Sequence, residues 1–128
     1  MECKLILEKG IGVIGELIPA KVEIKNTSKQ NIVIDYNISP WLHLDLVVID
    51  PKGKKISSCF YGDNYKGFPA EGRITLRHGE THSAIVAIQG NSDANDWTTP
   101  GSYKITAIFE YKGNRAVSKQ VELKLTPK

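Results

Sequence analysis

Apolar and polar residues alternate along most of this chain. In the segment from residue 103 to residue 111, every second position is apolar: Tyr103, Ile105, Ala107 and Phe109. An amphipathic helix would repeat its apolar residues at every third or fourth position, so a period of two predicts a strand that buries one face. The same alternation recurs along the chain, and no segment has a convincing helical period. The pattern therefore predicts an all-β protein.

The alternation predicts nine strands, at residues 3–8, 20–26, 31–36, 42–50, 55–61, 74–76, 82–89, 103–111 and 117–125. Turn signals separate them, for example Pro51 and Gly53 after the fourth strand. Short strands with a turn about every 8–12 residues are the signature of a β-sandwich. We therefore predict that residues 1–128 form a single domain, an immunoglobulin-like antiparallel β-sandwich of about eight or nine strands.

Two local signals refine this architecture. Tyr103 stands at the start of its strand, where immunoglobulin-like sandwiches place a corner tyrosine whose hydroxyl bonds loop backbone. Gly10, Gly12 and Gly15 follow the first strand and predict a kink that lets the chain cross between sheets. These glycines also match the GxGxxG string of dinucleotide-binding folds. A strand pattern with Pro19 follows them in place of a helix, so nucleotide binding is not expected.

Composition and charge argue against several classes of function. The hydrophobic content of 41% and charged content of 24% are ordinary for a globular protein. No run approaches the ~20 apolar residues of a membrane helix. The net charge is +3, but the lysines alternate with acids and do not gather with aromatics as on a nucleic-acid surface. The N-terminus has no export signal, so we expect a cytoplasmic protein. A secreted or cell-envelope protein is the alternative if a signal was removed.

Two loops contain residue types that bind metals. His78 and His82 are four residues apart, but Gly79 marks a turn, where the two rings do not share a face as they would on a helix. Asp93 and Asp96 offer carboxylates, but the residues that follow add none of the further oxygen ligands that calcium requires. We therefore expect no metal and no cofactor.

The two cysteines, Cys3 and Cys59, are expected to be free, partly buried thiols. A disulfide between them is the alternative in an oxidising compartment. Nucleophilic catalysis would need a base and an orienting group in contact with a thiol. His82 is a candidate base for Cys59, but neither residue lies in a known catalytic motif. The chain is therefore expected to be no enzyme.

Aromatic residues in the two long loops, 62–72 and 90–100, are the candidate contact residues. Exposed aromatics on a rigid scaffold are typical of binding surfaces, although sandwich loops also fold aromatics over the ends of the core. The predicted contact surface consists of Tyr65, Lys66, Gly67 and Phe68, with Asp96 and Trp97 as a second group.

The order of several motifs resembles a known family. These motifs lie at residues 21–28 (KVEIKNTS), 44–50 (LDLVVID), 76–81 (LRHGET) and 97–105 (WTTPGSYKI). They are similar to the bacterial intracellular proteinase inhibitors of the BsuPI type, over residues 20–125. The resemblance implies a non-catalytic protein-binding module, in its most specific form an inhibitor that presents loops at one end of the sandwich to a serine protease. The two long loops depart from the family pattern.

Two alternatives stay open. One is a structural or accessory domain of a cell-envelope or secreted protein, which would assemble with other subunits through an exposed edge strand. The other is a carbohydrate- or calcium-binding module. The sequence leaves open the identity of the partner, the compartment and the oligomeric state.

Overall fold

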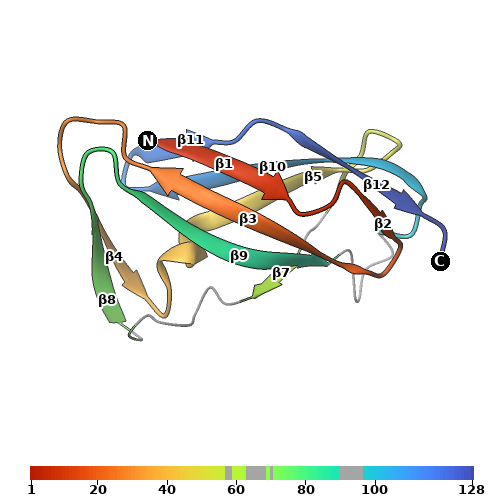
Figure 1. The fold of residues 1–128 in the computed structure, drawn as a ribbon, viewed down its shortest axis with the longest axis horizontal. Coiled ribbons are helices and arrows are strands. Elements are labelled where there is room, and N and C mark those ends of the chain that lie inside the picture. The colour runs from red at the N-terminus through yellow and green to blue at the C-terminus, as the bar shows by residue number, and fades with distance from the viewer. Residues whose placement is uncertain (57–58, 63–68, 70, 90–96) are drawn as a thin grey trace.

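The computed structural model describes residues 1–56, 59–62, 69, 71–89 and 97–128 (Figure 1). Its elements are β1 (Glu2–Leu7), β2 (Ile11–Val13), β3 (Leu17–Lys25), β4 (Ile32–Asn37), the 3-10 helix η1 (Pro40–His43), β5 (Leu44–Ile49), β6 (Lys55–Ile56), β7 (Cys59–Gly62), β8 (Glu71–Leu76), β9 (Thr81–Gln89), β10 (Gly101–Tyr111), β11 (Asn114–Val117) and β12 (Val121–Thr126). The prediction of an all-β fold is confirmed. The described part contains no helix with the length and apolar character needed to cross a membrane.

The strands form two main sheets that pack face to face (Figure 1). One has four strands in the order β1-β3-β9-β7. The other follows the order β2-β12-β10-β5-β6, with β11 also paired to β10. Strands β4 and β8 pair with each other in a separate two-stranded sheet at one end of the molecule. Among the described strands, all pairings are antiparallel except that of β2 with β12, which is parallel.

The core lies between the two main sheets and follows the alternation of the sequence. Val22 and Ile24 of β3 and Ile105 and Phe109 of β10 are almost fully buried. Trp41 of η1 closes the core beside Phe109, with the two rings edge to face at 6.2 Å between centroids. Burial of each such side chain contributes roughly 1.5–3 kcal/mol, so the inward half of each strand supplies most of the stabilisation.

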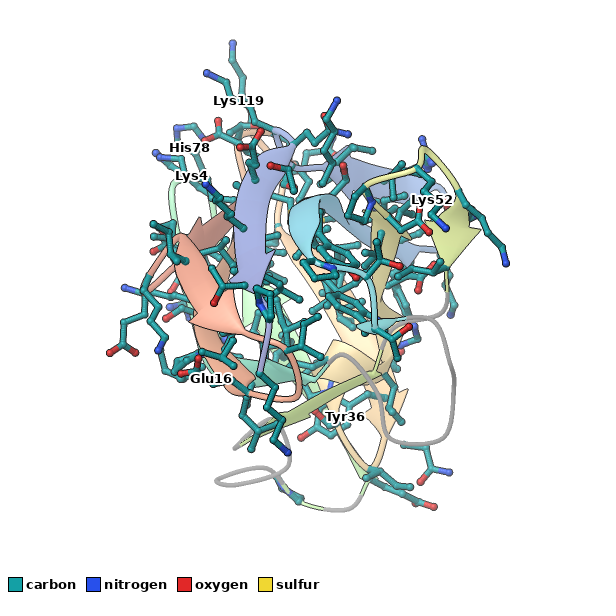
Figure 2. The ribbon with its side chains drawn as sticks, turned by 90° about the vertical axis from the view of Figure 1, so that its right-hand side faces the viewer. Lys4, Glu16, Tyr36, Lys52, His78 and Lys119 are labelled. Atoms are coloured by element: carbon teal, nitrogen blue, oxygen red, sulfur yellow. The ribbon has the colours of Figure 1, made fainter. Side chains whose placement is uncertain are left out.

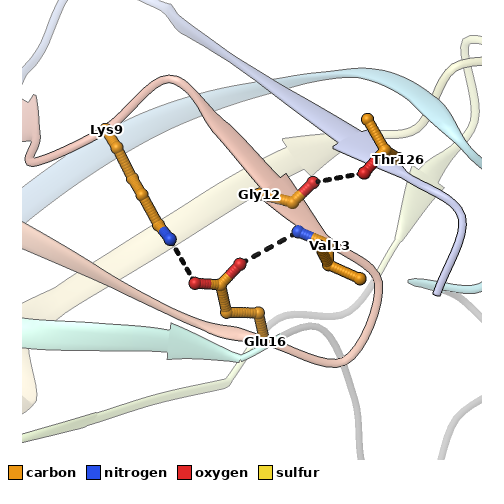
Figure 3. Close-up of polar contacts among 5 residues, drawn as sticks. All are labelled: Lys9, Gly12, Val13, Glu16 and Thr126. Carbon is orange, nitrogen blue, oxygen red and sulfur yellow. Dashed lines mark hydrogen bonds and ion pairs between the residues drawn. The ribbon is translucent and has the colours of Figure 1, made fainter.

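The predicted crossing of the chain between sheets is confirmed. Strand β1 belongs to the four-stranded sheet, whereas β2 runs beside β12 in the other sheet. Gly12 leaves room there for the buried Ile18 side chain, since a Cβ atom at this position would lie 2.6 Å from Ile18 Cδ1 and the isoleucine would have to shift. Glu16 closes the loop by an ion pair with Lys9 and by accepting a hydrogen bond from the Val13 N–H at 3.0 Å (Figure 3). The hydrogen bond from Lys9, more than that from Val13, lowers the pKa of Glu16.

The helix η1 was not predicted. Ser39 begins it by accepting a hydrogen bond from the Trp41 N–H on its Oγ atom, at 3.1 Å, and Pro40 has a φ angle already suited to a first helical turn. This turn corrects the prediction of a strand that begins at residue 42. Leu42 is instead 52% exposed, and β5 begins only at Leu44.

The last predicted strand is divided into β11 and β12. Ser118 interrupts it, because its N–H donates to the Ala107 carbonyl and its Oγ atom accepts from the Ala107 N–H, each at 2.8 Å. The same hydroxyl donates to the Lys119 carbonyl. One side chain thus takes the place of a backbone partner, and the chain bulges between the two strands.

Candidate protein-binding surfaces

Most of the predicted contact surface lies outside the described residues, namely Tyr65, Lys66, Gly67, Phe68 and Asp96. Trp97 is described, and it is only 3% exposed. Its ring stacks on Tyr103, with 4.9 Å between centroids and 3° between planes. The structure therefore places Trp97 over the end of the core, where it offers no exposed contact surface.

The corner role predicted for Tyr103 is confirmed. The side chain is fully buried and its hydroxyl donates to the Thr99 carbonyl at 2.7 Å. Burial raises the pKa of Tyr103, although the hydrogen bond with Thr99 acts in the opposite direction. The tyrosine thereby fixes the chain that enters β10 from the second long loop.

The turn that contains His78 makes a structural contact with another part of the chain. The His78 ring places Nδ1 at 2.7 Å from the Ser28 carbonyl, so it joins this turn to the connection after β3. Among the described residues, no group of three or more His, Cys, Asp or Glu side chains could hold a metal ion. The predicted calcium candidates Asp93 and Asp96 lie outside these residues.

The candidate pair of Cys59 and His82 is not brought together. Cys59 lies opposite Gln89, the last residue of β9, and His82 lies seven residues away, near the start of that strand. This separation is about 24 Å at ~3.4 Å per residue. A proton cannot pass directly between residues whose backbones are that far apart, so these two residues form no nucleophile–base pair.

Cys3 is a free thiol in the core, and burial raises its pKa from 9.0 to about 11. The thiolate is the reactive form, and a rise of two pKa units lowers its population about a hundredfold near neutral pH. At about pH 8 we therefore expect a disulfide reagent to modify Cys3 roughly a hundredfold more slowly in the folded protein than in urea. The measurement uses Cys59→Ser, so that only one thiol reacts. Equal rates in both states would show that Cys3 is accessible.

The outer face of the four-stranded sheet carries an exposed group of apolar side chains, which we call the apolar strip: Ile6, Leu17, Pro19 and Ile85. Ile6, Leu17 and Ile85 are 47%, 49% and 54% exposed. Ile6 and Ile85 flank Lys21 in one cross-strand row, and Pro19 lies in the next row. A shallow hollow lies between Ile6, Pro19 and Ile85, and Glu8 and Lys21 also line it. Exposed apolar residues are common singly, but several on one face, here with Lys21 between two of them, mark a candidate interaction site.

The other half of the same face is charged. Glu2 lies opposite Lys25, and Lys4 lies opposite Glu23, in the register of β1 and β3. Positive and negative charges therefore alternate beside the apolar strip. This arrangement matches the usual anatomy of a protein interface, in which an apolar centre has a polar rim.

A second feature is an open groove of about 540 Å³ between β1 and the connection from β11 to β12. We call it the edge groove. Cys3 and Leu5 line one side, and Val117 and Val121 line the other. Lys119 stands at its rim, and Figure 2 shows it with Lys4 in the same upper part of the molecule. The groove exists because neither β1 nor β11 is covered on this side by another described strand.

The sequence reasoning missed both surfaces. Ile6 and Ile85 occupy outward positions in strands where most other outward positions are polar, so a signal for the apolar strip was present. The edge groove had no comparable signal, because it depends on which strands become neighbours.

Comparison with known proteins bears on the fold alone. No family model and no curated protein matches the chain. Among solved structures, the sporulation control protein Spo0M from Bacillus subtilis is similar, with a TM-score of 0.61 and 18% sequence identity. The match covers 97% of this chain and 48% of Spo0M, so the chain spans about half the length of that protein. The resemblance to the intracellular proteinase inhibitors stays a prediction.

Proposed function

We propose that this chain is a non-catalytic protein-binding module that contacts its partner through the apolar strip. The observation that carries the proposal is the placement of three half-exposed aliphatic side chains, Ile6, Leu17 and Ile85, on one face of a paired sheet. When a partner covers these side chains, ordered water is released. The binding free energy then becomes more favourable by roughly 25 cal/mol for each Å² of apolar surface buried.

The rigidity of the scaffold favours binding at this face. Strand β3 pairs on both sides, with β1 and with β9, so the backbone under the strip is held in place before a partner arrives. A preorganised surface loses less conformational entropy on association than a mobile one. The alternating charges next to the strip would orient the partner and discriminate against partners of unmatched charge.

A second and more specific candidate is an inhibitor of a serine protease, in which the loops with residues 65–68 and 96, and not the apolar strip, make the contact. The family resemblance supports this finer proposal. The test is a titration of the purified chain against a panel of serine and cysteine proteases, with mass spectrometry to check that the chain stays intact. Stoichiometric inhibition by the intact chain supports it, and digestion or no inhibition of any protease overturns it.

The general proposal is tested by capture on the immobilised chain, with two variants for comparison. Ile85→Glu places a charge in the strip, whereas Leu42→Glu changes an equally exposed aliphatic residue elsewhere, in η1. We expect a protein that binds wild type and Leu42→Glu stoichiometrically, and Ile85→Glu at least about tenfold more weakly, because a buried unpaired charge costs more than 1.4 kcal/mol. Equal binding to all three would assign the partner to another surface.

A further inference from the structure

We propose that two copies of this chain pair through β1, antiparallel across a two-fold axis next to Cys3, so that their four-stranded sheets join into one. Among the described strands, β1 pairs with β3 alone, and their register runs without interruption from Glu2 to Leu7. Natural edge strands are usually protected by prolines, charged side chains, bulges or covering segments. Strand β1 contains no proline and the edge groove lies open beside it, so the charges of Glu2 and Lys4 decide what can pair there.

The free backbone groups of β1 can be assigned from one hydrogen bond. The Glu8 N–H donates to the Pro19 carbonyl at 3.0 Å, and the register places these two residues directly opposite each other. In an antiparallel pair, hydrogen-bonded and non-hydrogen-bonded positions alternate. The backbone groups of Cys3 and Leu5 therefore point away from β3, toward the open edge. A second strand would meet these groups first.

The charges on β1 select one register for a second copy. With Cys3 opposite the partner's Cys3, Glu2 stands opposite the partner's Lys4, and Lys4 stands opposite the partner's Glu2. A shift of two residues would place Lys4 against the partner's Lys4. A further shift of two would place Glu2 against the partner's Glu8. The first register is therefore the self-complementary one, as an isologous two-fold interface requires.

This register also gives hydrogen-bond partners to the outward-facing backbone groups of Cys3. Cys3 and the partner's Cys3 would exchange hydrogen bonds between the backbone groups that face outward. The partner's strand would lie over the edge groove, where Val117 and Val121 offer apolar surface from the opposite sheet. The pairing thus covers apolar surface and backbone groups that the single chain leaves in water.

The test measures association by sedimentation equilibrium on the full chain, with charge-reversal variants. We expect a wild-type dimer. Glu2→Lys and Lys4→Glu should each weaken it about tenfold or more, because both opposite-charge pairs become like-charge pairs. An equimolar mixture of the two variants should restore a dimer, since each lysine then meets a glutamate. Lys21→Glu, an exposed change in β3 away from the edge, should leave the dimer unchanged.

Hydrogen exchange identifies the strand that pairs. The amides of Cys3 and Leu5 should be protected in the wild-type dimer and exchange faster in Glu2→Lys. A wild-type chain that stays monomeric at about 200 µM overturns the proposal. The candidate occupant of the edge groove is then an extended segment of another protein. A dimer that neither charge reversal weakens also overturns it. Ile85→Glu should still dimerise, so this proposal and the apolar strip can fail separately.

Discussion

Replacement of Trp97 by alanine should lower the free energy of unfolding by about 3–5 kcal/mol, the usual cost of removing a large buried aromatic side chain. The ring is 3% exposed and stacks on Tyr103. Its removal would open a cavity beside the tyrosine whose hydroxyl bonds the Thr99 carbonyl. Urea denaturation followed by circular dichroism measures the change.

Two controls accompany this variant. Trp97→Phe keeps an aromatic ring in the stack and should cost less than the alanine variant. Leu42→Ala removes a side chain that is 52% exposed and should change stability by no more than about 0.5 kcal/mol. If Trp97→Ala unfolds at the same urea concentration as wild type, the indole ring does not pack on the core. Trp97 would then again be a candidate contact residue.

Replacement of Asn26 by aspartate should cost about 3 kcal/mol or more, although the two side chains have the same shape. The Asn26 side chain is fully buried and uses all of its hydrogen-bonding groups. Nδ2 donates to the carbonyls of Gln30 and Leu76, each at 2.7 Å, and Oδ1 accepts from the Ser28 N–H and hydroxyl. Aspartate would lose both donors and set a carboxylate oxygen against two carbonyl oxygens.

Thermal and urea unfolding at two pH values test this prediction. Protonation of the new carboxyl restores one donor, so the destabilisation relative to wild type should be smaller at about pH 4 than at about pH 7. Ser28→Ala is the matched control, since it removes the hydroxyl partner and leaves both Asn26 donors satisfied. It should cost only about 1 kcal/mol. A pH-independent loss in Asn26→Asp would contradict the assigned orientation of the amide.

The sequence predicts those parts of the fold that depend on local pattern. Period-two alternation identifies β3 and β10, and the position of Tyr103 before a long alternating segment identifies its corner role. The turn at η1 had a local signal too, because Ser39 followed by Pro40 is a usual helix start. The alternating leucines that follow favoured a strand from residue 42 instead. The bulge at Ser118 had no local sequence signal, since it depends on Ala107 of the neighbouring strand.

The candidate surfaces were harder to predict for a physical reason. Aromatic composition cannot distinguish a ring that covers the core from one that faces a partner, and Trp97 is the case in point. The edge groove depends on long-range pairing, because β1 and β12 are more than a hundred residues apart in the chain. Only their assignment to different sheets leaves the space between them open.

The crossing of the chain from β1 to β2 also determines how the molecule would respond to mechanical force. The C-terminus lies at one end of the long axis, and the N-terminus lies toward the other (Figure 1). Strand β2 is parallel to β12, so tension between the ends pulls these two strands in opposite directions along their own length. Strand β1 is pulled lengthwise along β3 in the same way. The bonds of each pair then share the load in shear and do not open one after another like a zipper, which makes the N-terminal segment a mechanical clamp for the whole sandwich.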